Sequence, residues 1–181
     1  MNFYDIIAQF FGIAAFLMSA LSFQAKNFKT ITVFKIISYI LFTVNYFMLT
    51  AYTGMISNVI SCLRGFIYIW MVEKGKSTKN AQILFSVIFI IFGIATWDGI
   101  ICIFAIMGAV IQTIAHGEKN PAKLRLINLP TCFMWMVYNV YYSSAGGLLS
   151  DIFSLISIVI AMIRLDIPEI KKMKQNKAKQ K

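Results

Sequence analysis

Charged residues are scarce in this sequence of 181 residues. Asp, Glu, Lys and Arg make up 13% of it and hydrophobic residues make up 59%, against about 25% and about 45–50% in soluble globular proteins. A soluble fold of this length could not cover so much apolar surface with so few charges. The composition therefore excludes an ordinary soluble domain and predicts a membrane protein.

Acidic residues are scarcer still. The sequence has 7 of them and 17 lysines and arginines, which gives a net charge of +10. Such an excess is also typical of nucleic-acid-binding proteins, but no RNA- or DNA-binding motif surrounds these residues. They lie between apolar runs and in the C-terminal tail, as expected for charges that orient a membrane protein. We expect the lipid bilayer as a partner and no binding to nucleic acid.

Cysteine and histidine are too few and too scattered for a disulfide framework or a metal site. Cys62, Cys102 and Cys132 each lie inside an apolar run, and His116 is the single histidine. The sequence also has no nucleophile elbow, no glycine-rich phosphate loop and no His-Glu-x-x-His motif. We therefore expect no metal, no cofactor and no enzymatic activity.

Seven apolar segments approach the length that crosses a bilayer, about 20 residues. Polar, charged or Gly- and Pro-containing stretches separate them. The predicted membrane helices are Ile6–Phe23, Ile31–Thr50, Met55–Val72, Ile83–Trp97, Ile100–His116, Leu126–Ser143 and Leu148–Ile167.

The basic residues predict the orientation of these helices. All of the 17 except Arg64 are assigned to the connections after the first, third and fifth helices or to the C-terminal end, with Lys35 counted in the first connection. The positive-inside rule then places the N-terminus outside and the C-terminus in the cytoplasm of a bacterial inner membrane. The basic tail, residues 168–181, is expected to be disordered or to lie on anionic headgroups.

The first and last three helices align with each other at an offset of 93 positions, without a gap. The aligned pairs are Lys26-Asn27 with Lys119-Asn120, Val44-Asn45-Tyr46 with Val137-Tyr138-Asn139, Gly54 with Gly147, Ser57 with Ser150, Asn58 with Asp151, and Ser61 with Ser154. We predict an all-α membrane protein with seven transmembrane helices in a 3+1+3 arrangement of two parallel three-helix repeats. The repeats comprise residues 1–72 and 100–167, residues 73–99 form a cytoplasmic loop and linker helix, and a substrate site is expected between the repeats.

Two stretches resemble the bacterial inner-membrane YgjV-like family, and the similarity extends over nearly the whole chain. They are Gly54-Met55-Ile56-Ser57 with Arg64, and the run that contains Thr131-Cys132, Trp135, Asn139, Ser144-Ala145-Gly146-Gly147, Asp151 and Ser154. This resemblance implies a multi-pass membrane protein. The helix plan also looks like the SWEET and PQ-loop superfamily of small-solute transporters, although the first and fifth helices lack that superfamily's Pro-Gln pair and the intramembrane proline, Pro130, lies in the sixth.

Polar residues inside the predicted helices are candidates for a solute pathway, because a charge at the bilayer centre costs about 2.5–3.5 kcal/mol on insertion scales. Arg64 is predicted to point toward the seventh helix, where Asp151 is the nearest acidic residue. The candidate pathway residues are Arg64, Asp151, Asn58, Ser57, Ser61, Ser150, Ser154, Asn45, Asn139 and Trp135. A structural interpretation stays open: Arg64 and Asp151 as a fixed ion pair, and the two asparagines as hydrogen-bonding contacts between helices. His116 is expected to face the headgroups.

Two functions follow from these patterns. One is a transporter of an unknown small solute that works by alternating access between the repeats. The other is a non-transporting membrane protein that assists assembly or binds a partner within the bilayer. The sequence leaves the solute open, and a monomer and a homodimer both stay open.

Overall fold

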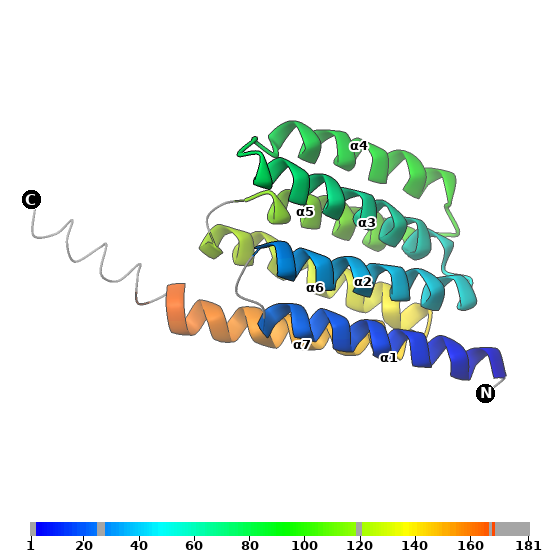
Figure 1. Cartoon of the computed structure of the whole chain (residues 1–181). Helices are drawn as coiled ribbons and strands as arrows, with labels where there is room; N and C mark the ends of the chain where they lie inside the picture. The colour runs from blue at the N-terminus through cyan, green and yellow to red at the C-terminus, as the bar shows by residue number, and fades with distance from the viewer. Residues whose placement is uncertain (1–2, 25–27, 119–120, 167, 169–181) are drawn as a thin grey trace, which may run out of the picture.

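The computed structural model describes residues 3–24, 28–118, 121–166 and 168, and these residues form a bundle of α-helices joined by short connections (Figure 1). Seven α-helices were predicted, and seven are present in the described residues. They are α1 (Phe3–Gln24), α2 (Phe28–Met48), α3 (Tyr52–Glu73), α4 (Lys79–Ala95), α5 (Cys102–His116), α6 (Pro121–Tyr141) and α7 (Ala145–Ala161), which continues into the short π-helix η1 (Met162–Asp166).

The helices lie along a common direction, and neighbours in the chain are neighbours in space (Figure 1). α2 packs between α1 and α3, α6 packs between α5 and α7, and α1 closes against α7. α4 lies at the edge of the bundle against α3 and α5. We call the end where α1, α3, α5 and α7 begin the N-terminal end of the bundle, and the end where they finish the C-terminal end.

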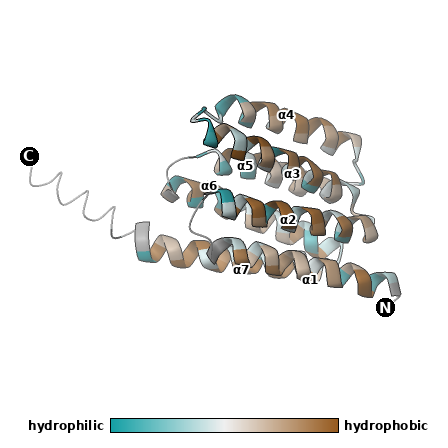
Figure 2. Cartoon of the chain, viewed as in Figure 1, coloured by the Kyte–Doolittle hydropathy of each residue, from teal (hydrophilic) through white to brown (hydrophobic). Residues whose placement is uncertain are grey.

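Many large hydrophobic side chains are exposed on the outside of the bundle, as expected in lipid. Figure 2 shows that hydrophobic residues predominate along the helices. Among the described residues, four helices are long and apolar enough to cross a membrane: Tyr4–Ser22, Lys29–Met48, Tyr52–Glu73 and Ala145–Arg164. α4 and α5 are apolar but shorter, with 17 and 15 residues. The prediction of an all-helical fold is therefore confirmed, and four of the helices could span a membrane by length and composition.

The α2–α3 and α6–α7 connections have the same backbone geometry. The amide of Ala51 donates to the Tyr46 carbonyl, and the amide of Ser144 donates to the Asn139 carbonyl, both at 2.9 Å. One residue earlier, Thr50 and Ser143 both have a positive φ, 57° and 53°. Each residue in the second connection lies 93 positions after its counterpart. The two turns thus match at the offset found in the sequence.

Five basic residues assigned to connections lie within helices instead, and two of them, Lys29 and Lys79, are in the first turns of α2 and α4. Lys35 is inside α2, while Lys123 and Arg125 belong to the first turns of α6, which begins at Pro121 rather than at Leu126. Proline suits the first position of a helix, where its missing N–H is not needed, so Pro121 starts a helix instead of interrupting one. Lys35 therefore does not contribute to the orientation signal of the first connection. The Lys26-Asn27 and Lys119-Asn120 pairs, and the tail from residue 169 on, lie outside the described residues.

Candidate functional site

Two adjoining cavities lie inside the bundle. The small cavity has a volume of about 70 Å³ and the large cavity about 470 Å³. They share lining residues, among them Lys35, Trp135 and Asp151. The large cavity extends from this shared wall to Ser22 and Glu118, which lie near the C-terminal end of the bundle. A hollow thus runs from the middle of the bundle to its C-terminal end.

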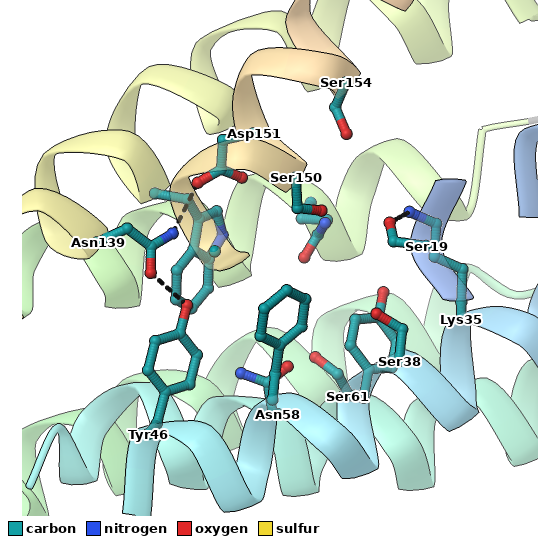
Figure 3. A pocket seen from close by; sticks show the side chains of 15 residues that line it. Ser19, Lys35, Ser38, Tyr46, Asn58, Ser61, Asn139, Ser150, Asp151 and Ser154 are labelled. Carbon is teal, nitrogen blue, oxygen red and sulfur yellow. Dashed lines mark hydrogen bonds between the residues drawn. The ribbon is translucent and has the colours of Figure 1, made fainter. Parts of the chain in front are cut away.

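The small cavity is lined mainly by polar side chains, and α1, α2, α3, α5, α6 and α7 all contribute to it (Figure 3). On one wall, Asp151 accepts a hydrogen bond of 2.7 Å from the Asn139 amide. Toward the opposite side, the Lys35 ammonium donates to the Ser19 hydroxyl at 2.9 Å. A volume of about 70 Å³ holds about two waters, each of which occupies roughly 30 Å³ in the liquid. The two opposite charges therefore belong to one small polar chamber.

Arg64 lies in the wall of the large cavity and is 1% exposed. Its Nη1 donates to Thr113 Oγ1 at 2.5 Å, and its Nη2 lies 3.5 Å from the Tyr39 hydroxyl and 3.4 Å from Nδ1 of His116. The Thr113 hydroxyl donates its own proton to the Ala109 carbonyl, so its oxygen lone pairs are directed to Arg64. The guanidinium is thus held by α5 and α2.

The predicted direction of Arg64 is wrong: it extends toward α5 and α2, not α7, and it makes no ion pair with Asp151. Along the helix axes the two residues differ in depth by roughly 9 Å, and hydroxyl acceptors on α5 and α2 lie nearer to the guanidinium. The expectation for His116 is also wrong, because its ring faces the Arg64 guanidinium within the bundle. Helical spacing gave the buried face of α3 correctly but not the helix that it faces.

Hydrogen bonds between distant helices close the hollow toward the N-terminal end. The Tyr46 hydroxyl of α2 donates to Asn139 Oδ1 of α6 at 2.7 Å, beside the small cavity (Figure 3). The backbone N–H of Gly54, at the start of α3, donates to the Tyr138 hydroxyl at 2.7 Å. Together these contacts join α2 and α3 to α6.

Asn45 also forms hydrogen bonds between helices, next to the start of α7. Its amide nitrogen donates to the Ala8 carbonyl at 2.7 Å, and its amide oxygen accepts from the Ser144 hydroxyl at 2.7 Å. α1 approaches α7 here so closely that a Cβ atom on Gly146 would collide with the backbone of Gly12. Asn45 therefore joins helices, the structural role that was left open for it.

Eight of the ten predicted pathway residues line one or both cavities. These are Asn58, Ser61, Arg64, Trp135, Asn139, Ser150, Asp151 and Ser154. Asn45 and Ser57 are buried but do not line either cavity. The predicted pathway residues did not include four other polar residues that line the small cavity, Lys35, Ser38, Tyr39 and Gln112. The signal for Lys35 was present, since a lysine inside an apolar helix faces a polar interior more often than lipid.

Comparison with known proteins agrees with the apolar bundle. A family model described as Imp-YgjV, bacterial inner membrane protein, matches residues 6–168. Neither a curated protein nor a solved structure matches the chain. The match includes all seven helices almost entirely. The chain therefore belongs to the Imp-YgjV family of bacterial inner membrane proteins.

Proposed function

We propose that this protein transports a small solute across the inner membrane by alternating access. The observation that carries the proposal is the hollow inside an apolar helical bundle, lined by charged and hydroxyl-bearing side chains, which reaches the C-terminal end and is closed toward the N-terminal end. Its larger part, about 470 Å³, is within the roughly 300–1,000 Å³ of small-molecule sites. The proposal assigns no catalytic reaction to the chain.

The polar residues favour a pathway over simple helix adhesion. A membrane protein that uses polar groups only to join helices can pair them in a filled core, as Asn45 does with Ala8 and Ser144. Lys35, Arg64 and Asp151 instead line space that a solute or water can occupy. Because burying charge in a bilayer is costly, three such residues around one hollow support a functional role.

The 3+1+3 arrangement of parallel repeats is part of this proposal. It is supported by the matching α2–α3 and α6–α7 turns and by α4, which lies outside both sets of three helices. Contacts across the bundle are also reciprocal: Asn45 reaches the start of α7, and Tyr138, which lies 93 positions later, reaches the start of α3. Rocking of one repeat against the other would break these contacts and open the N-terminal end.

In the orientation that we infer from the basic residues, the open end of the hollow faces the cytoplasm. Lys74 and Lys76 lie between α3 and α4, and Lys79 is the first residue of α4, so all three are at the C-terminal end of the bundle. By the positive-inside rule this end is cytoplasmic and the N-terminal end is outside. The structure then corresponds to a state open toward the cytoplasm.

Cysteine accessibility tests the hollow directly. In a background with Cys62, Cys102 and Cys132 replaced by alanine, Ser154→Cys places a thiol at the wall shared by both cavities. A membrane-impermeant thiol reagent should modify it in inside-out vesicles, because water in the hollow lets the thiolate form. The matched control is Ile156→Cys in the same helix, whose native side chain is 53% exposed on the outside of the bundle; it should react far more slowly in lipid.

A reporter fused to the C-terminus, expected in the cytoplasm, fixes the sidedness of these vesicles. If Ser154→Cys stays unmodified from both sides while the protein is folded, the hollow is dry and the transport proposal fails. If it reacts, uptake of labelled metabolites by proteoliposomes then identifies the solute.

A further inference from the structure

Arg64 is a buried cation whose hydrogen-bonding neighbours are uncharged. Thr113 and Tyr39 offer hydroxyls, His116 offers a ring nitrogen, and the Phe89 ring lies 5.5 Å from the guanidinium carbon. No carboxylate of the described residues forms an ion pair with it. A buried charge normally has a charged partner, because transfer from water to an apolar interior is costly. The protein thus holds a cation at the wall of a cavity without supplying its counter-charge.

The geometry of the guanidinium leaves room for another acceptor. The contact with Thr113 is short, but the two contacts of Nη2 are 3.4 and 3.5 Å, longer than the about 2.7–3.2 Å of good N–H···O bonds. A guanidinium has five N–H donors in a planar fork that matches a carboxylate or phosphate. The anchoring threonine fixes one edge of this fork, and the rest is available to an anion in the large cavity.

The other charged residues that line the large cavity also favour the binding of an anion. Its lining contains the cations Lys35, Arg64 and Arg125 and the acidic residues Glu118 and Asp151. Lys35 and Asp151 also face the same small cavity and act on each other electrostatically. The balance of the lining is positive, and Arg64 is its most deeply buried cation.

We propose that the large cavity binds a small anion, with Arg64 as the residue that contacts its carboxylate or phosphate group. This assignment rests on the transport function proposed above and names the chemical class of the solute. Thr113 is a positioning residue, since it holds the guanidinium and does not face the solute through a charge of its own.

Binding can be measured on the purified full-length protein without knowing the natural solute. Thermal unfolding is followed in detergent while acetate, succinate or inorganic phosphate is titrated at constant ionic strength, with chloride and glucose as reference probes. At least one of the three anions should raise the unfolding temperature of the wild type in a saturable way. In Arg64→Gln the half-saturating concentration should rise by about tenfold to a hundredfold, the equivalent of one lost charge-assisted hydrogen bond.

Arg64→Lys separates the effect of the planar guanidinium from that of its positive charge. Arg64→Lys keeps the charge but not the planar fork, and should bind more weakly than wild type and more tightly than Arg64→Gln. The matched control is Arg164→Gln, which removes an exposed arginine outside both cavities near the C-terminal end and should leave the anion titration unchanged. If Arg64→Gln does not fold, Thr113→Val removes the anchoring hydrogen bond and should weaken anion binding severalfold.

The outcomes distinguish this inference from the proposed function. If none of the anions stabilises the wild type more than chloride does, or if Arg64→Gln or Thr113→Val responds as the wild type does, the anion site is wrong. Proteoliposomes that carry a neutral solute under those conditions would leave the transport proposal standing. Saturable anion binding lost in the Arg64 variants, together with no flux of any solute, would uphold the anion site and defeat the transport proposal.

Discussion

Arg64 and Asp151 each have their own hydrogen-bonding partners within the bundle. Arg64 contacts Thr113, Tyr39 and His116, while Asp151 accepts from Asn139, which itself accepts from Tyr46. Because the two sets have no member in common, the two side chains are held in place independently. A substitution at one of them leaves the partners of the other in place.

This independence predicts the result of double-mutant cycles. Arg64→Ala and Asp151→Ala should be additive in the free energy of unfolding to within about 0.5 kcal/mol, because sites without shared partners rarely couple. Asn139→Ala and Asp151→Ala should instead show a coupling of about 0.5–3 kcal/mol, because they remove the two ends of one buried hydrogen bond. Thermal or denaturant unfolding of the single and double variants measures both. Strong coupling between Arg64 and Asp151 would contradict this prediction, because it would indicate a direct interaction between the two side chains.

The residue scale also shows what the sequence could and could not predict. The spacing of Ser57, Ser61, Arg64 and Tyr68 in the sequence, i, i+4, i+7 and i+11, is that of one helix face, and all four residues are buried in α3. That spacing contains no information on the neighbouring helix, so the partner of Arg64 was assigned to α7 instead of α5. Lys35 was missed as a lining residue because basic residues near predicted helix ends were all counted as orientation signals.

At the scale of elements, helices α1 and α7 depend on glycine where they meet. Gly12 and Gly146 face each other, and a Cβ on Gly146 would overlap the Gly12 backbone. The segment Ala145-Gly146-Gly147 was predicted as a turn, yet it forms the first turn of α7, where the Ser144 hydroxyl accepts from the Gly147 amide at 3.3 Å. Glycine here permits a close helix contact, a use common in membrane proteins. Gly54 likewise lies inside α3 and not before it.

Substitution of Gly146 tests this contact. Gly146→Ala should destabilise the protein by about 1–3 kcal/mol, because backbone atoms cannot move aside as a side chain can. Gly65→Ala is the matched control, since the added methyl would meet Cγ1 and Cδ1 of the Ile36 side chain and no backbone atom, and a side chain can change rotamer. Thermal unfolding in one detergent should therefore separate the two variants, with Gly146→Ala the less stable. Equal stability of the two would mean that α1 and α7 can separate without loss.

At the scale of the whole molecule, the hollow is open at one end and sealed by a few hydrogen bonds at the other. Tyr46–Asn139 lies directly beside the small cavity, between α2 and α6. The apolar periodicity of the sequence predicted the helices, and the offset of 93 also separates the matching residues of the α2–α3 and α6–α7 turns. The sequence could not predict which end of the hollow is closed, because this depends on how the two sets of helices pack against each other.

Loosening the seal should shift the protein toward the outward-open state. Tyr46→Phe removes the hydroxyl that binds Asn139 and keeps the ring, so packing is preserved. In the cysteine-free background, Ser150→Cys should then react faster with an impermeant reagent added to intact spheroplasts than it does without Tyr46→Phe. Tyr141→Phe, at an exposed position of α6, is the matched control and should have no effect. An unchanged rate in Tyr46→Phe would show that this hydrogen bond does not hold the closed end.

The contact between Tyr46 and Asn139 joins two positions that are 93 residues apart, the same separation that relates the two halves of the sequence. In a homodimer, a residue beside the two-fold axis meets its own copy and must be complementary to itself. Two identical tyrosines or two identical asparagines would have to share both donor and acceptor roles there. When two copies are fused in one chain, the two equivalent positions can hold different residues, so one can be the donor and the other the acceptor. In the repeat arrangement proposed above, the Tyr46–Asn139 pair is therefore an asymmetric contact that a single chain can encode and a symmetric dimer cannot.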